Sequence, residues 1–339
     1  MKILVTGGTG FIGSRLAIAA RAQGHEIVVA GQRNSDAERA RADELSAAGI
    51  QIEQGPLQDA GYAARVTQQC EVVIHLAAAQ HEANVPDAYF FDVNVNGTQT
   101  LLQASKSAGV RRFVYGSTIG VYGDSSGQTL DENTAPAPTN VYGRSKLRAE
   151  EVVKSYGDVL ETSIVRISET YGPGDFRLLK LFRALNRGRF FLIGPGLNRR
   201  QVIHVLDLAR GLLSAASSPA AVGQTFVLAG QEIMTTRDMV RQIASALGRP
   251  TPSFRAPLWP FLAAAVVLEG TLSPLGIQPP LHRRRLDFFR KSFVFSIAKA
   301  QNLLGFTPAI PFEAGAVETA QWYRKQGYLP PRARDTRPP

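Results

Sequence analysis

The sequence predicts an α/β protein built on a doubly wound parallel sheet, with a smaller, mainly C-terminal lobe. Along the first two-thirds of the chain, short β-branched runs alternate with helical stretches, the pattern of parallel strands joined by crossover helices. A glycine-rich turn follows the first of these runs at once. The chain has 339 residues, of which 44 % are apolar and 19 % charged. It is therefore long enough for a large unit with an added lobe, and its composition excludes a disordered or collagen-like chain.

The predicted strands are short runs rich in β-branched residues. They cover Lys2 to Val5, Glu26 to Ala30, Gln51 to Gln54, Val72 to Leu76, Arg112 to Tyr115, Ser163 to Ile167 and Thr225 to Leu228. Between them, helices are predicted over Ser14 to Gln23, Asp36 to Ala48, Gly97 to Ala108 and Ser145 to Ser155. After about Tyr171 the pattern changes to loops rich in Arg, Gly and Pro, then to a helix near Thr236 to Leu247.

These patterns divide the chain into two units. We expect residues 1–170 to form the sheet domain, with a later strand near 200–230 returning to it. Residues 171–199 and 231–328 are expected to form the second lobe. Residues 329–339 combine Pro and Arg without an apolar period, which indicates a flexible tail.

The charge balance narrows the kind of ligand. Thirty-eight Lys and Arg residues against 28 Asp and Glu give a net charge of +10, which favours an anionic ligand or surface. The basic residues do not form the aromatic-interleaved or groove-reading patterns of nucleic-acid recognition, so no nucleic-acid partner is expected. A phosphorylated cofactor and a membrane surface are the expected anionic partners.

Cysteine usage and hydropathy bear on location. Cys70 is the only cysteine, which rules out an intrachain disulfide and predicts a reducing, cytoplasmic environment. The N-terminus lacks the pattern of a signal peptide, and no stretch reaches the roughly 20 apolar residues of a spanning helix. The nearest approach, Pro257 to Leu268, is interrupted by Pro260 and is interpreted as a buried or interfacial helix.

The glycine-rich turn has the context of a dinucleotide-binding site. Gly7, Gly10 and Gly13 lie directly after the first strand and at the start of a helix, with Phe11 and Ile12 between the last two glycines. Such a turn needs a backbone bare enough for a pyrophosphate to approach the amides of the helix N-terminus. The first unit is therefore predicted to be a Rossmann-type NAD(P)-binding domain.

The end of the second strand predicts which dinucleotide is bound. The acid that usually holds the adenosine ribose hydroxyls is missing, and Gly31 stands at its place. Arg33 and Arg15 offer guanidinium donors to a 2′-phosphate, although both could equally be solvated surface residues. The sequence thus favours NADP(H), with NAD(H) less favoured.

A second constellation points to proton exchange with an alcohol or carbonyl. Tyr142 and Lys146 are four residues apart at the start of a predicted helix and therefore share one face. A nearby cation stabilises phenolate, so such a tyrosine can act as an acid or base. Thr118 follows the fifth predicted strand, where its hydroxyl would face the same crevice.

Taken together, these motifs resemble the extended short-chain dehydrogenase/reductase family, also described as the NAD(P)-dependent epimerase/dehydratase family. The resemblance covers about residues 1–328. Its motifs stand in the family's order, at Thr6 to Gly13, His75 to Ala78, Asn94 to Thr98, Ser117 to Gly123, Tyr142 with Lys146, Tyr171 to Asp175, Arg200 with Ile203 to Val205, Leu304 to Pro308 and Trp322 with Tyr323.

The resemblance implies a role for each matching residue. Tyr142 is implied to be the acid/base, Lys146 to bind the nicotinamide ribose and tune Tyr142, and Thr118 to bind the substrate oxygen. Asn94 is implied to buttress the sheet beside the cofactor. Further cofactor contacts are implied at Leu57, Leu76, Ala77 and Ala78, and substrate contacts at Gln80, Ile119, Gly120, Glu169 and Arg200. No metal is expected, because His75 and His204 lack metal-ligand neighbours and are predicted to be hydrogen-bonded structural residues.

The chain departs from the family in several places. The run Gly55 to Leu57 lacks the acid that often touches adenine. Ile119 and Gly120 replace the Asp-Glu pair of members that eliminate water, so dehydratase activity is not expected. Glu169 stands where nucleotide-sugar enzymes present an Asn to the diphosphate, and a carboxylate there would repel it, although Arg200 matches their diphosphate arginine.

The expected function is an NADP(H)-dependent oxidoreductase that interconverts a secondary alcohol and a ketone. The second lobe, through its apolar and Arg-rich 257–291 region, is similar to the 3β-hydroxysteroid and sterol dehydrogenase branch, which implies a steroid-like or isoprenoid substrate. An apolar segment beside a basic stretch suits either such a substrate or shallow docking on an anionic bilayer, so peripheral membrane contact through this region is a further expectation. The alternatives are a nucleotide-sugar 4-epimerase with tightly bound NAD and a non-catalytic NADP-binding sensor or assembly subunit. By resemblance, the chain is expected to form a homodimer.

Overall fold

The computed structural model describes residues 1–80, 85–124, 127–272, 279, 281 and 283–330. The predicted tail from residue 331 onward lies outside the described residues.

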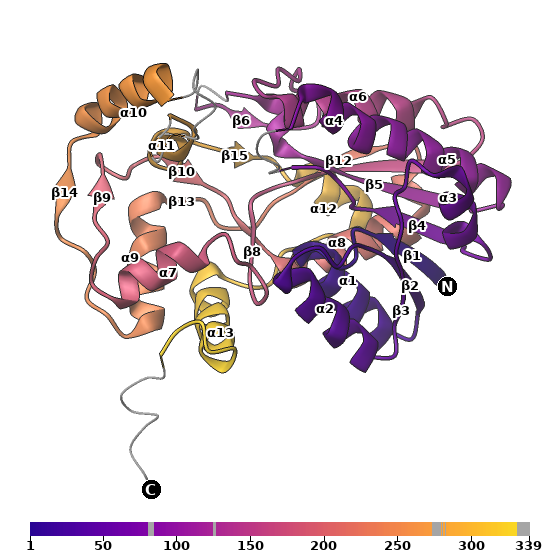
Figure 1. Ribbon diagram of the computed structural model, residues 1–339, viewed down its shortest axis with the longest axis horizontal. Helices are drawn as coiled ribbons and strands as arrows, with labels where there is room; N and C mark the ends of the chain where they lie inside the picture. The colour runs from indigo at the N-terminus through magenta and orange to yellow at the C-terminus, as the bar shows by residue number, and fades with distance from the viewer. Residues whose placement is uncertain (81–84, 125–126, 273–278, 280, 282, 331–339) are drawn as a thin grey trace, which may run out of the picture.

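The fold is organised around one seven-stranded sheet, with all neighbouring strands parallel (Figure 1). Its strand order is β12-β7-β5-β4-β1-β2-β3, which confirms the predicted doubly wound α/β class. The order reverses between β1 and β4, where such sheets open a crevice for a ligand. The strands are β1 (Lys2–Thr6), β2 (Glu26–Ala30), β3 (Gln51–Glu53), β4 (Val72–His75), β5 (Arg112–Thr118), β7 (Glu161–Ile167) and β12 (Thr225–Leu228).

Helices cover both faces of this sheet because its strands are apolar on both sides. Ile3 and Val5 of β1 pack into one core, and Leu4 between them packs into the other. The first core includes side chains of α1 (Phe11–Ala22), α2 (Asp36–Ala47), α8 (Val205–Ser217) and α12 (Ala298–Leu304). The second includes side chains of α3 (Ala60–Thr67), α5 (Gly97–Ser107) and α6 (Val141–Lys154). Two short helices, α4 (Asp87–Phe91) and the π-helix η1 (Asp92–Asn96), precede α5.

A third apolar core holds the second lobe together. It joins α7 (Leu179–Asn186), α9 (Thr236–Leu247) and α13 (Phe312–Lys325), with Phe182 and Tyr323 packed edge to face at its centre. Short strand pairs lie outside the seven-stranded sheet: β8 (Thr170–Tyr171) with β11 (Ile203–His204), β9 (Leu192–Ile193) with β14 (Arg255–Ala256), β10 (Arg199–Arg200) with β13 (Met234–Thr235), and β6 (Thr129–Leu130) with β15 (Val294–Phe295). The pair of β6 and β15 joins the lobe to the sheet domain. The region after Tyr171 thus contains several helices that the sequence analysis did not predict, among them α7, α8, α12 and α13.

The apolar run near residue 260 forms helix α10 (Leu258–Leu272), with α11 (Arg283–Arg290) beside it (Figure 1). Pro260 does not interrupt α10, because it lies in the first turn, where a backbone N–H has no partner within the helix. Of its fifteen residues only Ala265 is buried, so the interpretation as a buried helix is wrong. Among the described residues, no helix combines the length and the apolar composition that a membrane crossing requires.

Candidate active site

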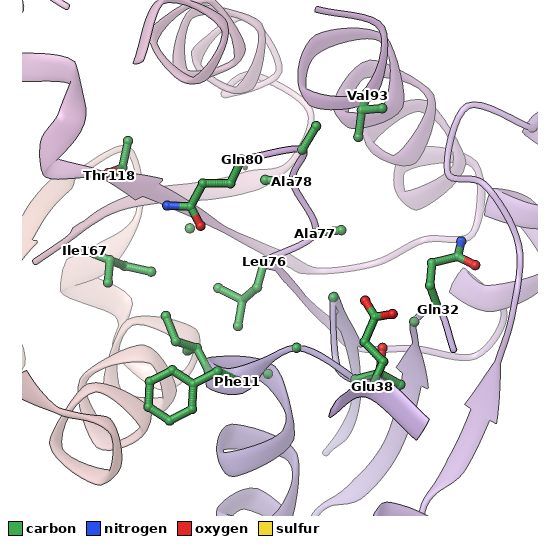
Figure 2. Close-up of a pocket in the computed structure, with 18 of the residues that line it drawn as sticks. Phe11, Gln32, Glu38, Leu76, Ala77, Ala78, Gln80, Val93, Thr118 and Ile167 are labelled. Carbon is green, nitrogen blue, oxygen red and sulfur yellow. The ribbon is translucent and has the colours of Figure 1, made fainter. Parts of the chain in front are cut away.

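A cavity of about 740 Å³ lies at the carboxyl ends of the sheet strands, beside the reversal of strand order. Figure 2 shows Leu76, Ala77 and Ala78 along its middle. Thr118 and Ile167 lie toward one end, and Gln32 and Glu38 toward the other. The loops that follow several different strands therefore meet at one elongated site.

The glycine-rich turn lines this cavity and is shaped for a close approach of backbone and ligand. Gly7 has φ +65°, and a Cβ there would lie 2.7 Å from the backbone nitrogen of Ala77. A Cβ on Gly13 would lie 2.3 Å from the carbonyl oxygen of Gly7. Gly10 is the N-cap of α1 and supplies no side-chain cap, so the first amides of the helix are left for an anion. The turn therefore fits the pyrophosphate of a dinucleotide.

Three buried side chains, Thr6, His75 and Thr98, are hydrogen-bonded in series next to the glycine-rich turn. His75 Nδ1 lies 2.6 Å from Thr6 Oγ1, and His75 Nε2 lies 2.9 Å from Thr98 Oγ1. Thr6 Oγ1 also accepts the backbone N–H groups of Leu76 and Ala77. Burial lowers the pKa of His75 to about 3, so the imidazole is neutral near pH 7. His75 is the hydrogen-bonded structural residue expected from the sequence.

The three residues expected to act on the substrate all line the cavity. Thr118 ends β5, and its Oγ1 accepts the backbone N–H of Gly120 at 3.0 Å, which leaves its hydroxyl hydrogen for another acceptor. Tyr142 and Lys146 lie in the first turns of α6, which begins where Asn140 Oδ1 accepts the N–H of Gly143. The hydroxyl, the phenol and the ammonium therefore come together from a strand end and a helix start.

Lys146 is held in surroundings that disfavour its charge. Its side chain is buried, and its Nζ lies 4.0 Å from the centre of the Tyr115 ring. Burial lowers the pKa of Lys146 to about 7, although the carboxylate of Glu150, one turn later, acts in the opposite direction. Near pH 7 the ammonium and the neutral amine of Lys146 are therefore both populated, and an anion in the cavity would favour the ammonium form.

A buried ion pair that the sequence analysis missed lies behind these residues. Glu150 and Arg166 are both buried, and Arg166 Nη2 lies 2.8 Å from Glu150 Oε2. Ser117 Oγ donates to Glu150 Oε1, and Arg166 Nη1 donates to the hydroxyl of Tyr122. The network thereby links the end of β5, which carries Thr118, to the helix that carries Lys146. Glu150 is four residues after Lys146, so helical spacing is the signal that could have identified it.

Asn94 has the buttressing role that the resemblance implies and does not itself line the cavity. Its Oδ1 accepts the N–H of Ala79 at 2.8 Å, and its Nδ2 donates to the carbonyl of Ala79 and to Ser145 Oγ. The loop after β4 is thereby tied to the helix that carries Tyr142 and Lys146.

The part of the cavity next to β2 differs from the sequence expectation. Arg15 and Arg33 do not line the cavity, because acids of α2 hold both: Arg15 donates to both carboxylate oxygens of Glu44, and Arg33 lies 3.8 Å from Asp43. Gly31 does line it, and a Cβ there would lie 2.5 Å from Thr9 Oγ1.

Glu38 and Arg41 of α2, which the sequence analysis did not select, line this part of the cavity instead of Arg15 and Arg33. Glu38 lines the cavity and belongs to a capping box with Ser35, in which Glu38 Oε2 accepts the N–H groups of Asn34 and Ser35. Arg41 also lines it and donates to the carbonyl of Gly174 at 2.8 Å. Burial, with the charge of Arg15 nearby, lowers the pKa of Arg41. The Ser-x-x-Glu pattern before a helix is the signal that could have identified Glu38.

The remaining residues divide as follows. The other cofactor residues named from the sequence that line the cavity are Gly10, Phe11, Ile12, Leu57, Leu76, Ala77 and Ala78. Of the residues named for the substrate, Gln80, Ile119 and Glu169 line it, whereas Gly120 and Arg200 do not.

Glu169, which lines the cavity, is paired with Arg200. Arg200 Nη2 donates to both carboxylate oxygens of Glu169, with the second contact at 2.6 Å. The Arg200 side chain is buried, its Nη1 donates to the carbonyl of Phe288, and its guanidinium lies 4.3 Å from the centre of the Phe288 ring. Glu169 is partly exposed to the cavity. The arginine charge is therefore neutralised within the protein.

Comparison with known proteins agrees with this geometry. The sequence model of the family described as "NAD dependent epimerase/dehydratase family" matches residues 3–229. The chain is 30 % identical to the 3 beta-hydroxysteroid dehydrogenase/Delta 5→4-isomerase of Mycobacterium tuberculosis, over 95 % of this chain and 90 % of that protein. It is 28 % identical to the dTDP-glucose 4,6-dehydratase of Streptomyces antibioticus, over 96 % and 92 %.

Among solved structures, the chain is similar to DesIV, a dTDP-glucose 4,6-dehydratase from Streptomyces venezuelae, in a crystal structure with NAD bound. The TM-score is 0.78 at 26 % identity, over 98 % of this chain and 99 % of that one. With the match over residues 3–229 and the cavity at the reversal of strand order, the chain belongs to the NAD dependent epimerase/dehydratase family, that is, the extended short-chain dehydrogenases/reductases.

Proposed function

We propose that this family member is an oxidoreductase that interconverts a secondary alcohol and a ketone on an apolar, steroid-like or isoprenoid substrate. Support for the reaction type comes from one cavity that brings the glycine turn together with Thr118, Tyr142 and Lys146. Bound NAD(P) would accept a hydride from the alcohol in the oxidative direction and donate one to the ketone in the reductive direction. It would lie with its pyrophosphate at the turn of Gly7 to Gly13 and its nicotinamide end toward Tyr142.

In the oxidative direction each residue has a defined task. Thr118 donates its hydroxyl hydrogen to the substrate oxygen, because its own oxygen already accepts the N–H of Gly120. Tyr142, as phenolate, accepts the hydroxyl proton of the substrate. Lys146, as ammonium, stabilises that phenolate from the same helix face. In the reductive direction Tyr142 returns the proton to the carbonyl oxygen.

The pair of Glu169 and Arg200 supports the substrate class and is the observation that carries it. A nucleotide sugar would bring a diphosphate, which needs an available cation. Arg200 is already paired with Glu169, and the partly exposed carboxylate of Glu169 would repel the diphosphate oxygens. An apolar alcohol has no such conflict. The similarity to a 3 beta-hydroxysteroid dehydrogenase is consistent with this choice.

For the cofactor we favour NADP(H), with NAD(H) as the alternative. Gly31 leaves the end of β2 without an acid, and Arg41 brings a cation into the cavity wall. Arg33 forms a loose, exposed ion pair with Asp43, with 3.8 Å between Nη1 and Oδ1. A 2′-phosphate could take the place of Asp43 as the partner of Arg33. Glu38 is the opposing feature, because its carboxylate suits the ribose hydroxyls of NAD(H) and would repel a 2′-phosphate.

A nucleotide-sugar 4-epimerase is the alternative function. It is favoured by the match of Arg200 to the family's diphosphate arginine and by the similarity to dTDP-glucose enzymes. We do not favour dehydration, because Ile119 and Gly120 follow Thr118 and offer no acid and base for the removal of water. A non-catalytic NADP-binding sensor or assembly subunit is the second alternative.

One experiment separates these functions. The purified protein is mixed with NADP or NAD and with sterols, isoprenoid alcohols, UDP-glucose or dTDP-glucose, and the absorbance of reduced nicotinamide is followed. We expect net reduction of added cofactor with an apolar alcohol. Sugar isomerisation without net cofactor turnover would instead establish the epimerase, a 4-keto-6-deoxy product the dehydratase, and cofactor binding without any turnover the sensor.

A further inference from the structure

Helix α10 is apolar from Leu258 to Leu268, with its one charged residue, Glu269, near its end, and nevertheless it lies on the surface of the second lobe. Trp259 is 72 % exposed, Val266 53 % and Val267 62 %. A helix without a polar face is normally buried in a protein core or in a membrane. Figure 1 shows α10 at the outer end of the lobe, away from the central sheet.

Aromatic residues from the neighbouring strands extend this surface. Phe254, which immediately precedes β14, is 67 % exposed, and its ring centre lies 5.8 Å from that of Phe191. Phe191 in turn lies 6.2 Å from Phe261 of α10. We call Phe191, Phe254, Trp259, Val266 and Val267 the α10 patch. A group of large exposed apolar side chains on one helix and the strands beside it marks a surface that a partner or a membrane covers.

The positive charge around the α10 patch distinguishes between a second copy of the chain and a membrane as the partner that covers the patch. Residues 249–291 contain seven Lys and Arg residues against two Asp and Glu, a net charge of +5, which is half of the net charge of the whole chain. Arg255 and Arg290, which lie beside the patch and at the end of α11, are both exposed. A second copy of the same chain would bring cations against cations. An anionic phospholipid surface offers apolar volume for the patch and negative charge for its rim.

The length of α10 fixes the mode of contact. Fifteen helical residues extend about 22 Å, which is shorter than the roughly 30 Å hydrocarbon layer of a bilayer. The helix can therefore lie in the interface and cannot cross it. Trp259, in its first turn, is of the residue type that membrane interfaces favour.

We propose that the α10 patch docks this protein on the surface of an anionic phospholipid bilayer, with α10 lying in the plane of the interface. The inference goes beyond the proposed function and does not rest on it, since neither cofactor nor substrate takes part in the contact. An oxidoreductase with any substrate could dock in this way.

The test uses the full chain without cofactor or substrate, so its result is independent of any activity. The protein is sedimented with phosphatidylcholine vesicles, with and without phosphatidylglycerol. The chain has two tryptophans, so a Trp322→Phe variant leaves Trp259 as the only tryptophan, and its emission reports whether it enters an apolar medium. The variants are Trp259→Ser and the double variant Val266→Ser/Val267→Ser. Val159→Ser is the matched control, because Val159 is 52 % exposed and lies just before β7 in the sheet domain.

We expect binding to the vesicles that contain phosphatidylglycerol, a blue shift of the Trp259 emission, and weakening at high salt. Each patch variant should bind about tenfold more weakly, and Val159→Ser should bind as the unaltered protein does. Absence of binding to anionic vesicles, or equal binding by the patch variants, would overturn the proposal. So would a dimer in vesicle-free solution that the patch variants convert to monomer, because a second copy would then cover the patch.

Discussion

Glu169→Gln provides the most specific test of how the site selects its substrate. In the unaltered protein the buried guanidinium of Arg200 donates to both oxygens of the Glu169 carboxylate. The substitution removes the negative charge and keeps an amide oxygen that can accept one hydrogen bond. Arg200 retains its contacts with the carbonyl and the ring of Phe288, so it should stay in place with a charge available to an anion.

The magnitude follows from the charges involved. Two unit charges about 4 Å apart interact by about 4 kcal/mol at an effective dielectric constant of about 20. The Glu169 side chain is 38 % exposed, so solvent screens much of this interaction and about 1–2 kcal/mol is a realistic effect on a bound anion. We therefore expect UDP or dTDP to bind about tenfold more tightly to Glu169→Gln than to the unaltered protein. The stability cost should be about 1 kcal/mol, since the buried arginine loses a charged partner.

The assay is calorimetric titration with UDP and dTDP, with urea unfolding as a check on folding. The control is the double variant Glu169→Gln/Arg200→Gln, in which the gain should disappear because the released cation is absent. If the double variant gained as much affinity as the single variant, or if the unaltered protein already bound these nucleotides equally well, the argument from neutralisation of Arg200 would be refuted.

Three further predictions concern other parts of the site. Arg33→Ala should weaken NADP binding much more than NAD binding, and Glu38→Gln should improve NADP binding relative to NAD binding. Both variants are titrated with both dinucleotides. Equal losses of NADP and NAD affinity in Arg33→Ala would count against NADP(H). Thr118→Val should lower kcat about a hundredfold or more, whereas Thr118→Ser should stay within about tenfold, and similar rates for the two would remove the hydroxyl from the mechanism. Burial lowers the pKa of His75 from an ordinary 6.5 to about 3. As the pH falls from 6.5 toward 3, His75 is protonated in the unfolded chain but not in the folded one, so the free energy of unfolding decreases over this range. At about pH 5 this amounts to about 2 kcal/mol relative to pH 7, and urea unfolding at both values should show a correspondingly smaller pH dependence for His75→Gln.

Local patterns predicted the sheet domain well because its elements obey local rules. β2 and β12 have the predicted bounds, and α2 ends one residue before the predicted end. β5 runs through Gly116, Ser117 and Thr118, beyond the predicted strand, because β7 pairs with it to its end. That pairing is a tertiary contact, and Gly116 and Ser117, which have little strand propensity, become part of the strand through it.

The region after Tyr171 was harder to predict because its elements depend on distant partners. α8 follows a stretch whose Arg, Gly and Pro content indicates loops, although Leu208 and Leu212 have helical spacing and pack against the sheet. α10 shows the reverse, since its composition suggests burial while the fold leaves it exposed.

In the candidate site, residue types and their order along the chain were predictable, but the ion pairs were not. Glu169 and Arg200 are 31 positions apart, and no local pattern indicates that they meet. Whether Arg33 or Arg41 faces the cavity depends on how the capping box of Ser35 and Glu38 starts α2. The cytoplasmic location and the homodimer stay predictions.

The central claim is that Tyr142 exchanges a proton with the substrate while hydride passes to or from the nicotinamide. Tyr142→Phe removes only the phenolic hydroxyl and keeps the ring. Turnover of cofactor with an apolar alcohol is measured alongside the dissociation constant of the cofactor. We predict a loss of kcat of at least about a hundredfold with cofactor affinity essentially unchanged. Turnover within a few fold of the unaltered protein would contradict the assignment of Tyr142 as the acid/base.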